Sequence, residues 1–357
     1  MLSRWLAAVV LCVIAATAQA DANANADHWQ YTVRPGDTLW NLCERFAQDP
    51  VFCWRQLAAN SAVDDPYRMS PGKVILIPLA WLKEQPMPAR AERVNGQVWL
   101  RVGDNDPEPV ENGAEIAFGD TIETGEAGSV VVRFADNSEV AVKPDTVLKV
   151  NHYRRFVDVG NEPTELQLER GAIRNTVTPR DTDARVFRVY TPGVMTAVRG
   201  TEYHVRVTDD AVTLSEVVKG EVEVAAARSA TPVPAGYGTL ARDGQAPAQP
   251  VKLLPAPEVT LKAGGRSLRA EWPPVEGAEA YSVELFDADG VLRQSEQISE
   301  PQWRAKPQAG EYQLLVRAID ARGLRGQERL LDATVSKGAW PWDALLFIGG
   351  AGLLLAL

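Results

Sequence analysis

The sequence predicts a multidomain, mainly β protein in which a small strand–helix–helix–strand unit precedes two all-β domains. Residues 31–78 place two short runs of helical apolar spacing between two extended runs. Residues 94–242 alternate repeatedly between apolar and polar side chains and contain no helical stretch of any length. Connectors rich in proline separate this region from its neighbours, and a total of 357 residues is long for one domain.

The first residues, 1–20, have the pattern of a secretory signal peptide. Arg4 precedes an apolar run that ends in Ala18-Gln19-Ala20, with small residues at both positions that a signal peptidase requires. We expect cleavage after Ala20 and export to the periplasm or cell envelope. The alternative is a membrane anchor, although the apolar run is well short of the roughly 20 residues that a spanning helix needs.

The next segment, residues 31–78, is expected to fold as one small unit. Apolar residues recur at helical spacing in two places, and Asp37 or Thr38 is a suitable N-cap for the first helix. The chain before and after the helices is extended and ends at Pro78. The expected elements are a strand at 31–33, helices at 38–46 and 52–59, and a strand at 73–78.

Cys43 and Cys53 are the cysteines that remain after removal of the leader. An exported protein meets an oxidising compartment in which disulfides persist, so we expect these two residues to bridge the two short helices. Two buried free thiols are the alternative. The sequence has no C-x-x-C pair, which leaves a redox or zinc motif unsupported.

The stretches YTVRPGDTLWNLCERF and NSAVDDPYRMSPGKVILIP closely resemble a LysM domain, and the resemblance covers the whole unit. It implies binding to glycan that contains N-acetylglucosamine, which for an exported bacterial protein means peptidoglycan. Tight turns at Pro35-Gly36 and Pro71-Gly72 would expose backbone N–H and C=O groups that suit an acetamido group. The segment between the helices and the second loop are slightly longer than the common pattern, so the groove geometry is not carried over. The glycan-binding residues that the resemblance implies are Gly36, Asp37, Thr38, Leu39, Asn60, Tyr67, Met69, Pro71 and Gly72.

Three of the residues in the first helix region have a purely structural alternative. Asp37 and Thr38 could serve only as helix caps, and Trp40 could pack on the sheet instead of facing a ligand.

A linker over residues 79–93 leads into the all-β region. The run GSVVVRFADNSEVAV predicts a hairpin, because Asp136-Asn137-Ser138 separates two alternating runs. Two further runs, LERGAI and VVKGEV, are each interrupted in the same way by a glycine, which suggests a weak internal repeat or two unrelated turns.

Residues 94–225 resemble a FecR-like domain, carried above all by VYTPGVMTAVRGTEYHVRV and the following VVKGEVEV. The proteins that name this family pass a surface signal to a cytoplasmic sigma factor, and they have a cytoplasmic head before a membrane helix. This chain has a leader and a LysM-like unit instead. The sigma-factor role is therefore not carried over, and the resemblance implies an envelope-side β domain of unspecified ligand. The residues of the FecR-like motif are Arg199, Gly200, Thr201, Glu202 and Tyr203.

Arg199 is expected to lie on a central strand, where its guanidinium needs an acceptor such as Glu202 or Glu216. The alternative is that Arg199 faces a groove and binds an acidic group of a partner. Gly200 interrupts the apolar stripe and suggests a bulge or a close backbone approach. His204 is expected on the exposed face of the same strand.

The remaining chain consists of a connector, a third β unit and an apolar tail. Residues 226–255 are rich in proline and alanine, and residues 256–336 resemble a fibronectin type III-like sandwich, with Trp272 on an early strand. The tail, residues 340–357, is predicted to contact a membrane or to be the front half of a spanning helix. A buried terminal segment is the alternative.

Charge and motifs exclude several functions. The formal net charge is −10 at pH 7, and no basic patch of the kind that binds nucleic acid is visible, so we expect no nucleic-acid partner. We find no H-E-x-x-H, G-x-S-x-G or P-loop motif, and we expect no catalytic residue, no metal site and no cofactor.

The sequence thus favours a non-enzymatic envelope protein that is anchored to peptidoglycan and binds or regulates an unknown second envelope protein as a sensor or scaffold. One alternative is an accessory subunit of a membrane signalling receptor. The other is a wall-modifying enzyme with an unrecognised site.

Overall fold

The computed structural model describes residues 28–336 except 61–64, 87–88, 153, 157–159, 162–163, 180–186, 199 and 265. The predicted leader, the predicted C-terminal tail and Arg199 lie outside the described residues. The chain divides into two compact units, which are described separately. Within the described ranges, no helix has the length and apolar character needed to cross a membrane.

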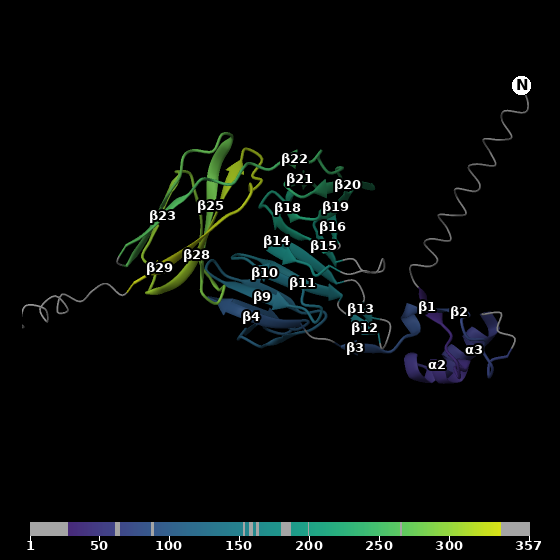
Figure 1. The fold of residues 1–357 in the computed structure, drawn as a ribbon. Helices are drawn as coiled ribbons and strands as arrows, with labels where there is room; N and C mark the ends of the chain where they lie inside the picture. Colours follow the sequence, from purple (N-terminus) through teal and green to yellow (C-terminus); the bar gives the residue numbers. More distant parts are fainter. Residues whose placement is uncertain are drawn as a thin grey trace, which may run out of the picture. The chain divides into compact units, whose positions relative to one another are not determined.

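The N-terminal unit has the expected order of strand, helix, helix and strand (Figure 1). Its two strands pair antiparallel, with Tyr31 opposite Ile75. One face of this small sheet and the apolar faces of both helices share a core that includes Leu39, Phe46 and Leu57. The elements are β1 (His28–Thr32), α2 (Leu39–Phe46), α3 (Pro50–Asn60), β2 (Val74–Pro78) and the 3₁₀ helix η1 (Leu79–Trp81).

A second, three-stranded sheet also belongs to the N-terminal unit. Its central strand, β12, comes from far along the chain. This strand pairs antiparallel with β3 on one side and with β13 on the other. The strands are β3 (Glu84–Pro86), β12 (Arg154–Phe156) and β13 (Gly160–Asn161).

The second unit begins with a central β region, residues 89–252, made of two sheets that share one long strand, β14 (Glu165–Thr176). The first sheet has the order β7-β4-β9-β10-β14-β17-β18-β21-β22. The second has the order β6-β5-β8-β11-β14-β15-β16-β19-β20, in which β14 and β15 run parallel. The other strands are β4 (Ala89–Asn95), β5 (Val98–Arg101), β6 (Glu108–Pro109), β7 (Glu115–Ile116), β8 (Thr121–Thr124), β9 (Ser129–Arg133), β10 (Glu139–Val142), β11 (Val147–His152), β15 (Phe187–Thr191), β16 (Val194–Val198), β17 (Glu202–Val207), β18 (Thr213–Lys219), β19 (Glu221–Ala226), β20 (Ser229–Pro234), β21 (Tyr237–Ala241) and β22 (Val251–Lys252).

Gly171 marks the point at which β14 passes from one sheet to the other. Residues before it pair with β11, and residues from Gly171 onward pair with β17. Its φ is +89°, and a Cβ there would lie 2.3 Å from the Thr146 hydroxyl oxygen. Glycine is therefore required by both conformation and space. The sequence suggested an interruption here, whereas the strand continues through the glycine.

The second unit ends in a two-sheet sandwich, residues 260–335. Its sheets have the orders β23-β24-β27 and β26-β25-β28-β29. Apolar residues from both sheets, among them Leu268, Tyr281, Trp303 and Val316, enclose one core, which also contains Trp272. The strands are β23 (Thr260–Gly264), β24 (Ser267–Glu271), β25 (Ala278–Asp287), β26 (Leu292–Ile298), β27 (Gln302–Ala305), β28 (Gly310–Asp320) and β29 (Arg329–Val335).

The fold class expected from the sequence, mainly β after a small helical unit, is confirmed. Helix α3 starts at Pro50, before the expected residue 52, because proline fits the first turn of a helix, where its missing N–H has no intrahelical partner. The identification of the sandwich as fibronectin type III-like stays a prediction.

Candidate glycan-binding site

The two glycine turns of the N-terminal unit lie at the same end of its sheet. Gly36 has φ +89° and Gly72 has φ +87°, a conformation that favours glycine. A Cβ built on either residue would meet nothing within 4 Å. The backbone at both turns therefore borders open space, where a ligand can approach it closely.

Backbone hydrogen bonds tie the two loops together. The Val33 N–H donates to the Lys73 carbonyl at 2.8 Å, and the Gly72 N–H donates to the Val33 carbonyl at 2.9 Å. The Leu39 N–H donates to the Pro66 carbonyl at 3.0 Å. The loops before α2 and before β2 thus form one surface with a fixed geometry.

Asp37 holds the first loop in place. One carboxylate oxygen, Oδ2, accepts from the Tyr31 hydroxyl at 2.7 Å and from the Arg34 N–H at 2.7 Å. Burial raises the pKa of Tyr31, and the hydrogen bond to Asp37 raises it further, so the hydroxyl stays a donor. This arrangement supports the structural role for Asp37 rather than a contact with a ligand.

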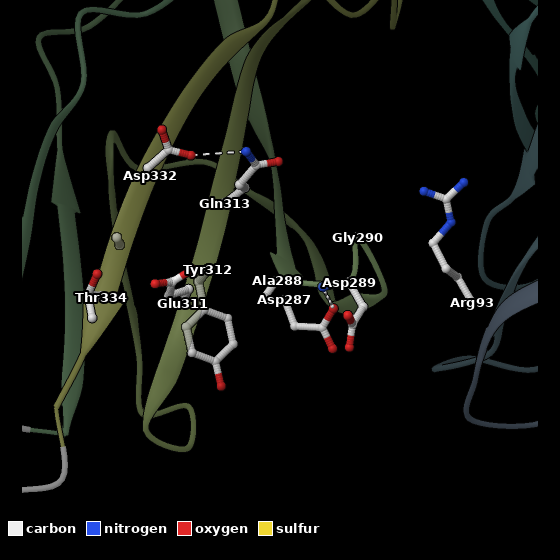
Figure 2. Close-up of a pocket in the computed structure, with 11 residues that line it drawn as sticks. Arg93, Asp287, Ala288, Asp289, Gly290, Glu311, Tyr312, Gln313, Asp332 and Thr334 are labelled. Carbon is white, nitrogen blue, oxygen red and sulfur yellow. Dashed lines mark hydrogen bonds between the residues drawn. The ribbon is translucent and has the colours of Figure 1, made fainter.

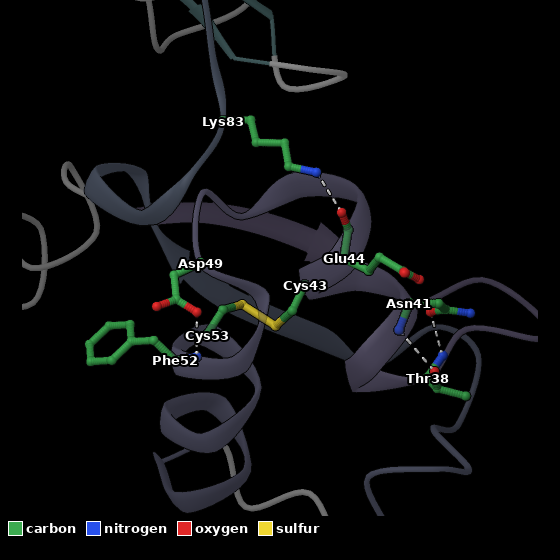
Figure 3. Close-up of a disulfide and its surroundings, with 8 residues drawn as sticks. All are labelled: Thr38, Asn41, Cys43, Glu44, Asp49, Phe52, Cys53 and Lys83. Atoms are coloured by element: carbon green, nitrogen blue, oxygen red, sulfur yellow. Dashed lines mark hydrogen bonds between the residues drawn. A yellow bond between two sulfur atoms is a disulfide. The ribbon is translucent and has the colours of Figure 1, made fainter.

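Thr38 is the N-cap of α2 (Figure 3). The Asn41 N–H donates to the Thr38 hydroxyl at 3.1 Å, and the Thr38 N–H donates to the Asn41 side-chain oxygen at 2.8 Å. This capping box satisfies two N–H groups that would otherwise lack partners at the start of the helix. The side chain of Thr38 therefore serves as a helix cap, which is the structural alternative expected for it.

The other predicted glycan-binding residues divide by exposure. The side chains of Leu39, 0% exposed, and Met69, 8% exposed, belong to the core, so these two residues can offer only their backbone to a glycan, and their place among the glycan-binding residues stays a prediction. Tyr67 is 67% exposed, and Pro71 is exposed beside Gly72. Asn60 ends α3, and its side chain lies outside the described part of the structure.

Trp40 was not among the predicted site residues. It lies in the first turn of α2 and is 42% exposed. An aromatic side chain that stays exposed next to a proposed sugar site can stack on a pyranose ring, because its face is apolar and broad. The candidate surface thus combines backbone at Gly36 and Gly72 with the exposed rings of Trp40 and Tyr67.

A disulfide joins the two helices of this unit (Figure 3). Cys43 on α2 and Cys53 on α3 are joined, with Cα atoms 5.7 Å apart, and both side chains are buried. The Lys83 ammonium donates to the Glu44 carbonyl at 2.6 Å and adds a second tie to α2. The helices that carry the two loops are thereby held against each other.

The FecR-like motif lies at the centre of the first sheet, where β17 pairs with both β14 and β18. Gly200 has φ +62°, and a Cβ there would lie 2.6 Å from the Pro179 Cα, which is the close backbone approach expected from the sequence. Thr201 and Tyr203 are buried. Glu202, one expected acceptor for Arg199, pairs with Arg174, and the expectation for Arg199 itself falls outside the described residues.

His204 corrects the expectation of an exposed strand face. It is 8% exposed, and its Nε2 lies 2.9 Å from Glu328 Oε1 of the sandwich. Glu216, the other acceptor expected for Arg199, accepts from the Arg325 N–H at 3.0 Å. The polar face of β17 is therefore covered by another part of the same unit.

A cleft of about 600 Å³ opens between the sandwich and β4, with Arg93 across from the β25–β26 turn (Figure 2). Asp287 in this turn accepts from the N–H groups of Asp289 and Val291 and pairs with Arg293 at 2.6 Å. That carboxylate is used by the turn itself. We assign no ligand to the cleft, whose lining residues are Arg93, Asp287, Ala288, Asp289, Gly290, Glu311, Tyr312, Gln313, Asp332, Ala333 and Thr334.

Comparisons with solved structures give only distant similarity. The chain is similar to a candidate anti-sigma factor from Parabacteroides distasonis, at 17% identity and a TM-score of 0.32, over 37% of this chain and 59% of that one. It is also similar to a β-1,2-glucanase from the same organism, at 12% identity and a TM-score of 0.22, over 73% of this chain and 39% of that one. No curated protein matches.

Family models match the chain in two places. The LysM domain model covers residues 31–78, the whole strand–helix–helix–strand unit, and the FecR protein model covers residues 120–223 of the central β region. The second match begins later than residue 94, where the sequence resemblance was expected to start. The chain therefore carries a LysM domain followed by a FecR region.

Proposed function

We propose that the protein is a non-enzymatic envelope protein that binds peptidoglycan through its LysM domain and presents the FecR region and sandwich to a second envelope protein. The observation that carries the first half is the pair of turns at Gly36 and Gly72, tied together and open to solvent. Backbone N–H and C=O groups in such turns suit an acetamido group, and Tyr67 and Trp40 supply aromatic faces.

A sedimentation assay with insoluble peptidoglycan tests this proposal on the full chain. We expect the protein to pellet with peptidoglycan and to be released by oligomers of N-acetylglucosamine. Glucose oligomers of the same length should not release it, since they lack the acetamido group. Protein that stays in the supernatant beside a LysM protein that pellets would contradict the proposal.

Tyr67→Ala is the sharpest variant for this assay. Tyr67 is exposed, so its removal should leave stability unchanged within about 0.5 kcal/mol while binding weakens. Phe52→Ala is the matched control, because Phe52 is also exposed but packs edge-on against Trp81, beyond the opposite end of α2. If Tyr67→Ala and Phe52→Ala bind peptidoglycan equally well, Tyr67 does not contact the glycan, and the binding site lies elsewhere on the domain.

The second half of the proposal has a support of its own. It rests on the match of the FecR protein model to residues 120–223 of the central β region. A zymogram on purified peptidoglycan separates a binding protein from a wall-modifying enzyme: clearing by the purified protein would overturn the non-enzymatic proposal.

A further inference from the structure

The contact between the first sheet of the central β region and the sandwich is dominated by charge. On the sheet side, the outward residues of β14, β17 and β18 face the segment that joins β28 to β29. The Arg206 guanidinium donates to the Gly323 carbonyl, and the Arg174 guanidinium lies 3.2 Å from Glu328. Both halves contribute charges of both signs to this contact. The cationic residues are Lys143, Arg174, Arg206, Arg317 and Arg325, and the acidic residues are Glu202, Glu216, Glu284 and Glu328.

The apolar part of the contact is small. Three leucines, Leu214, Leu253 and Leu324, form a buried cluster, with Leu240 and Val251 packed against it. The charged side chains of the contact therefore outnumber the apolar side chains of this cluster.

His204 lies inside this charged contact as its one group that titrates near neutral pH. Its Nε2 faces the Glu328 carboxylate at 2.9 Å, so the neutral ring carries its proton on Nε2 and donates to Glu328. Glu328 also pairs with Arg174, so the negative charge of Glu328 already has a cationic partner without His204. Cationic groups outnumber carboxylates in the contact before His204 gains a second proton.

We propose that the contact is an acid-sensitive clamp: protonation of His204 releases the sandwich from the β14–β17–β18 face, while residues 253–259 keep the sandwich joined to the central β region. Opening exposes Arg174, His204 and Arg206 together. The exposed face would accept a partner that offers carboxylates where Glu328 lies in the closed state. The proposal concerns the second unit alone and does not depend on glycan binding.

The direction of the pH effect follows from the surroundings of the ring. Burial lowers the pKa of His204 well below 6.5, and the charges of Arg317, Arg174 and Lys143 lower it further, against the opposing effect of Glu284. In the open state the ring is hydrated and regains an ordinary pKa of about 6.5. The closed state is therefore fully favoured above about pH 6.5 and loses stability as the pH falls below it.

The size of the effect is set by one proton. Each pH unit below about 6.5 shifts the ratio of open to closed protein by up to about tenfold, until the pH reaches the pKa of the closed state. Between pH 6.5 and pH 4.5 the expected shift is up to about 100-fold.

Spin labels on the full chain measure this opening directly. Cysteines introduced by Glu223→Cys in the central β region and Arg304→Cys in the sandwich lie on exposed positions; Cys43 and Cys53 are already joined, and Cys12 is replaced by serine so that it takes no label. We expect one short-range distance distribution at pH 7.5 and a broad, longer one at pH 4.5. A distribution that stays the same over this range would overturn the proposal.

His204→Gln is the decisive variant, since its amide can still donate to Glu328 but cannot gain a proton near neutral pH. We expect it to remain closed at pH 4.5, whereas the control His28→Gln, in the N-terminal unit, should open as the parent does. Opening of His204→Gln at the same pH as the parent would contradict the clamp.

Histidine NMR of the unaltered protein gives an independent readout if the variant fails to fold. The nitrogen shifts of His204 report its protonation, and they should change over the same pH interval as the distances. Opening with a neutral His204 ring would assign the acid response to another group and overturn the proposal.

Discussion

Lys143 and Glu284 lie 141 positions apart in the sequence and form an ion pair of 2.8 Å in which both side chains are buried. The Lys143 ammonium also lies 5.0 Å from the centre of the Phe286 ring. The pair joins the end of β10 to the sandwich strand β25. It is the most enclosed polar link described between the two halves of the second unit.

Removal of one partner of this pair should destabilise the second unit strongly. Lys143→Met leaves Glu284 buried without its counter-charge, which costs about 3–5 kcal/mol. The double variant Lys143→Met/Glu284→Leu should recover most of that loss, because an apolar pair of similar volume needs no counter-charge. Urea unfolding of the four proteins of the cycle gives the coupling.

The matched control for this cycle is Arg90 and Glu115, a pair 3.2 Å apart in which both side chains are 61% exposed. Arg90→Ala should cost less than about 1 kcal/mol. Similar losses for the two single variants, Lys143→Met and Arg90→Ala, would show that burial does not set the strength of the first pair.

Glu284 should also make the second unit sensitive to strong acid. Burial opposes its ionisation, but the charges of Lys143 and Arg325 outweigh burial and lower its pKa from 4.5 to about 2. Its contribution to stability is therefore complete above pH 4.5 and is lost as the pH falls toward 2. This lowered pKa requires the closed contact, so the measurement is made in the His204→Gln protein, which should stay closed at pH 4.5. In its denaturant unfolding, the further change Glu284→Gln should flatten the decline between pH 4.5 and 2, and an unchanged slope would refute the assignment.

The disulfide should contribute to the stability of the LysM domain. It closes a short loop, with a sequence separation of 10, for which the chain-entropy model gives about 3 kcal/mol. The double variant Cys43→Ala/Cys53→Ala should lower the free energy of unfolding of this domain by about that amount. Alkylation of both cysteines in the exported protein without reductant, detected by mass spectrometry, would exclude the bond.

Gly36→Ala should weaken glycan binding and also destabilise the fold. The positive φ makes any side chain costly by about 1–2 kcal/mol, and the new methyl group would project into the open space beside the turn. Gly103→Ala, in the second unit, has the same kind of φ, +57°, and the same open surroundings, and is the matched control. In sedimentation with peptidoglycan, we expect the affinity of Gly36→Ala to be at least about tenfold lower than that of the parent protein, and the affinity of the control to be unchanged.

The N-terminal unit could be predicted from sequence because its determinants are local. Helical spacing, a cap at Thr38 and turn glycines lie within a few residues of the elements that they define. The side chains of Leu39 and Met69 could not be assigned in this way. A resemblance fixes which positions border the site, but the burial of a particular side chain depends on how the two loops pack.

The charged contact in the second unit could not be predicted, because its partners are distant in sequence. His204 alternates with Tyr203 and Val205 as a residue on the exposed face of a half-buried strand does, and distant partners such as Glu328, 124 positions later, show that this face is covered. Period-two patterning distinguishes the two faces of a strand, but it does not show whether another domain covers the polar one.

The shared strand β14 has a consequence for how the chain reaches its native state. Its first half needs β11 and β15, and its second half needs β10 and β17, so pairing from several distant segments must be complete before either sheet has its full width. Such non-local pairing folds slowly and leaves strand edges unpaired for longer. A newly made chain would therefore be most vulnerable to aggregation and proteolysis before β17 has joined β14, and factors that hold unfolded chains would act in that interval.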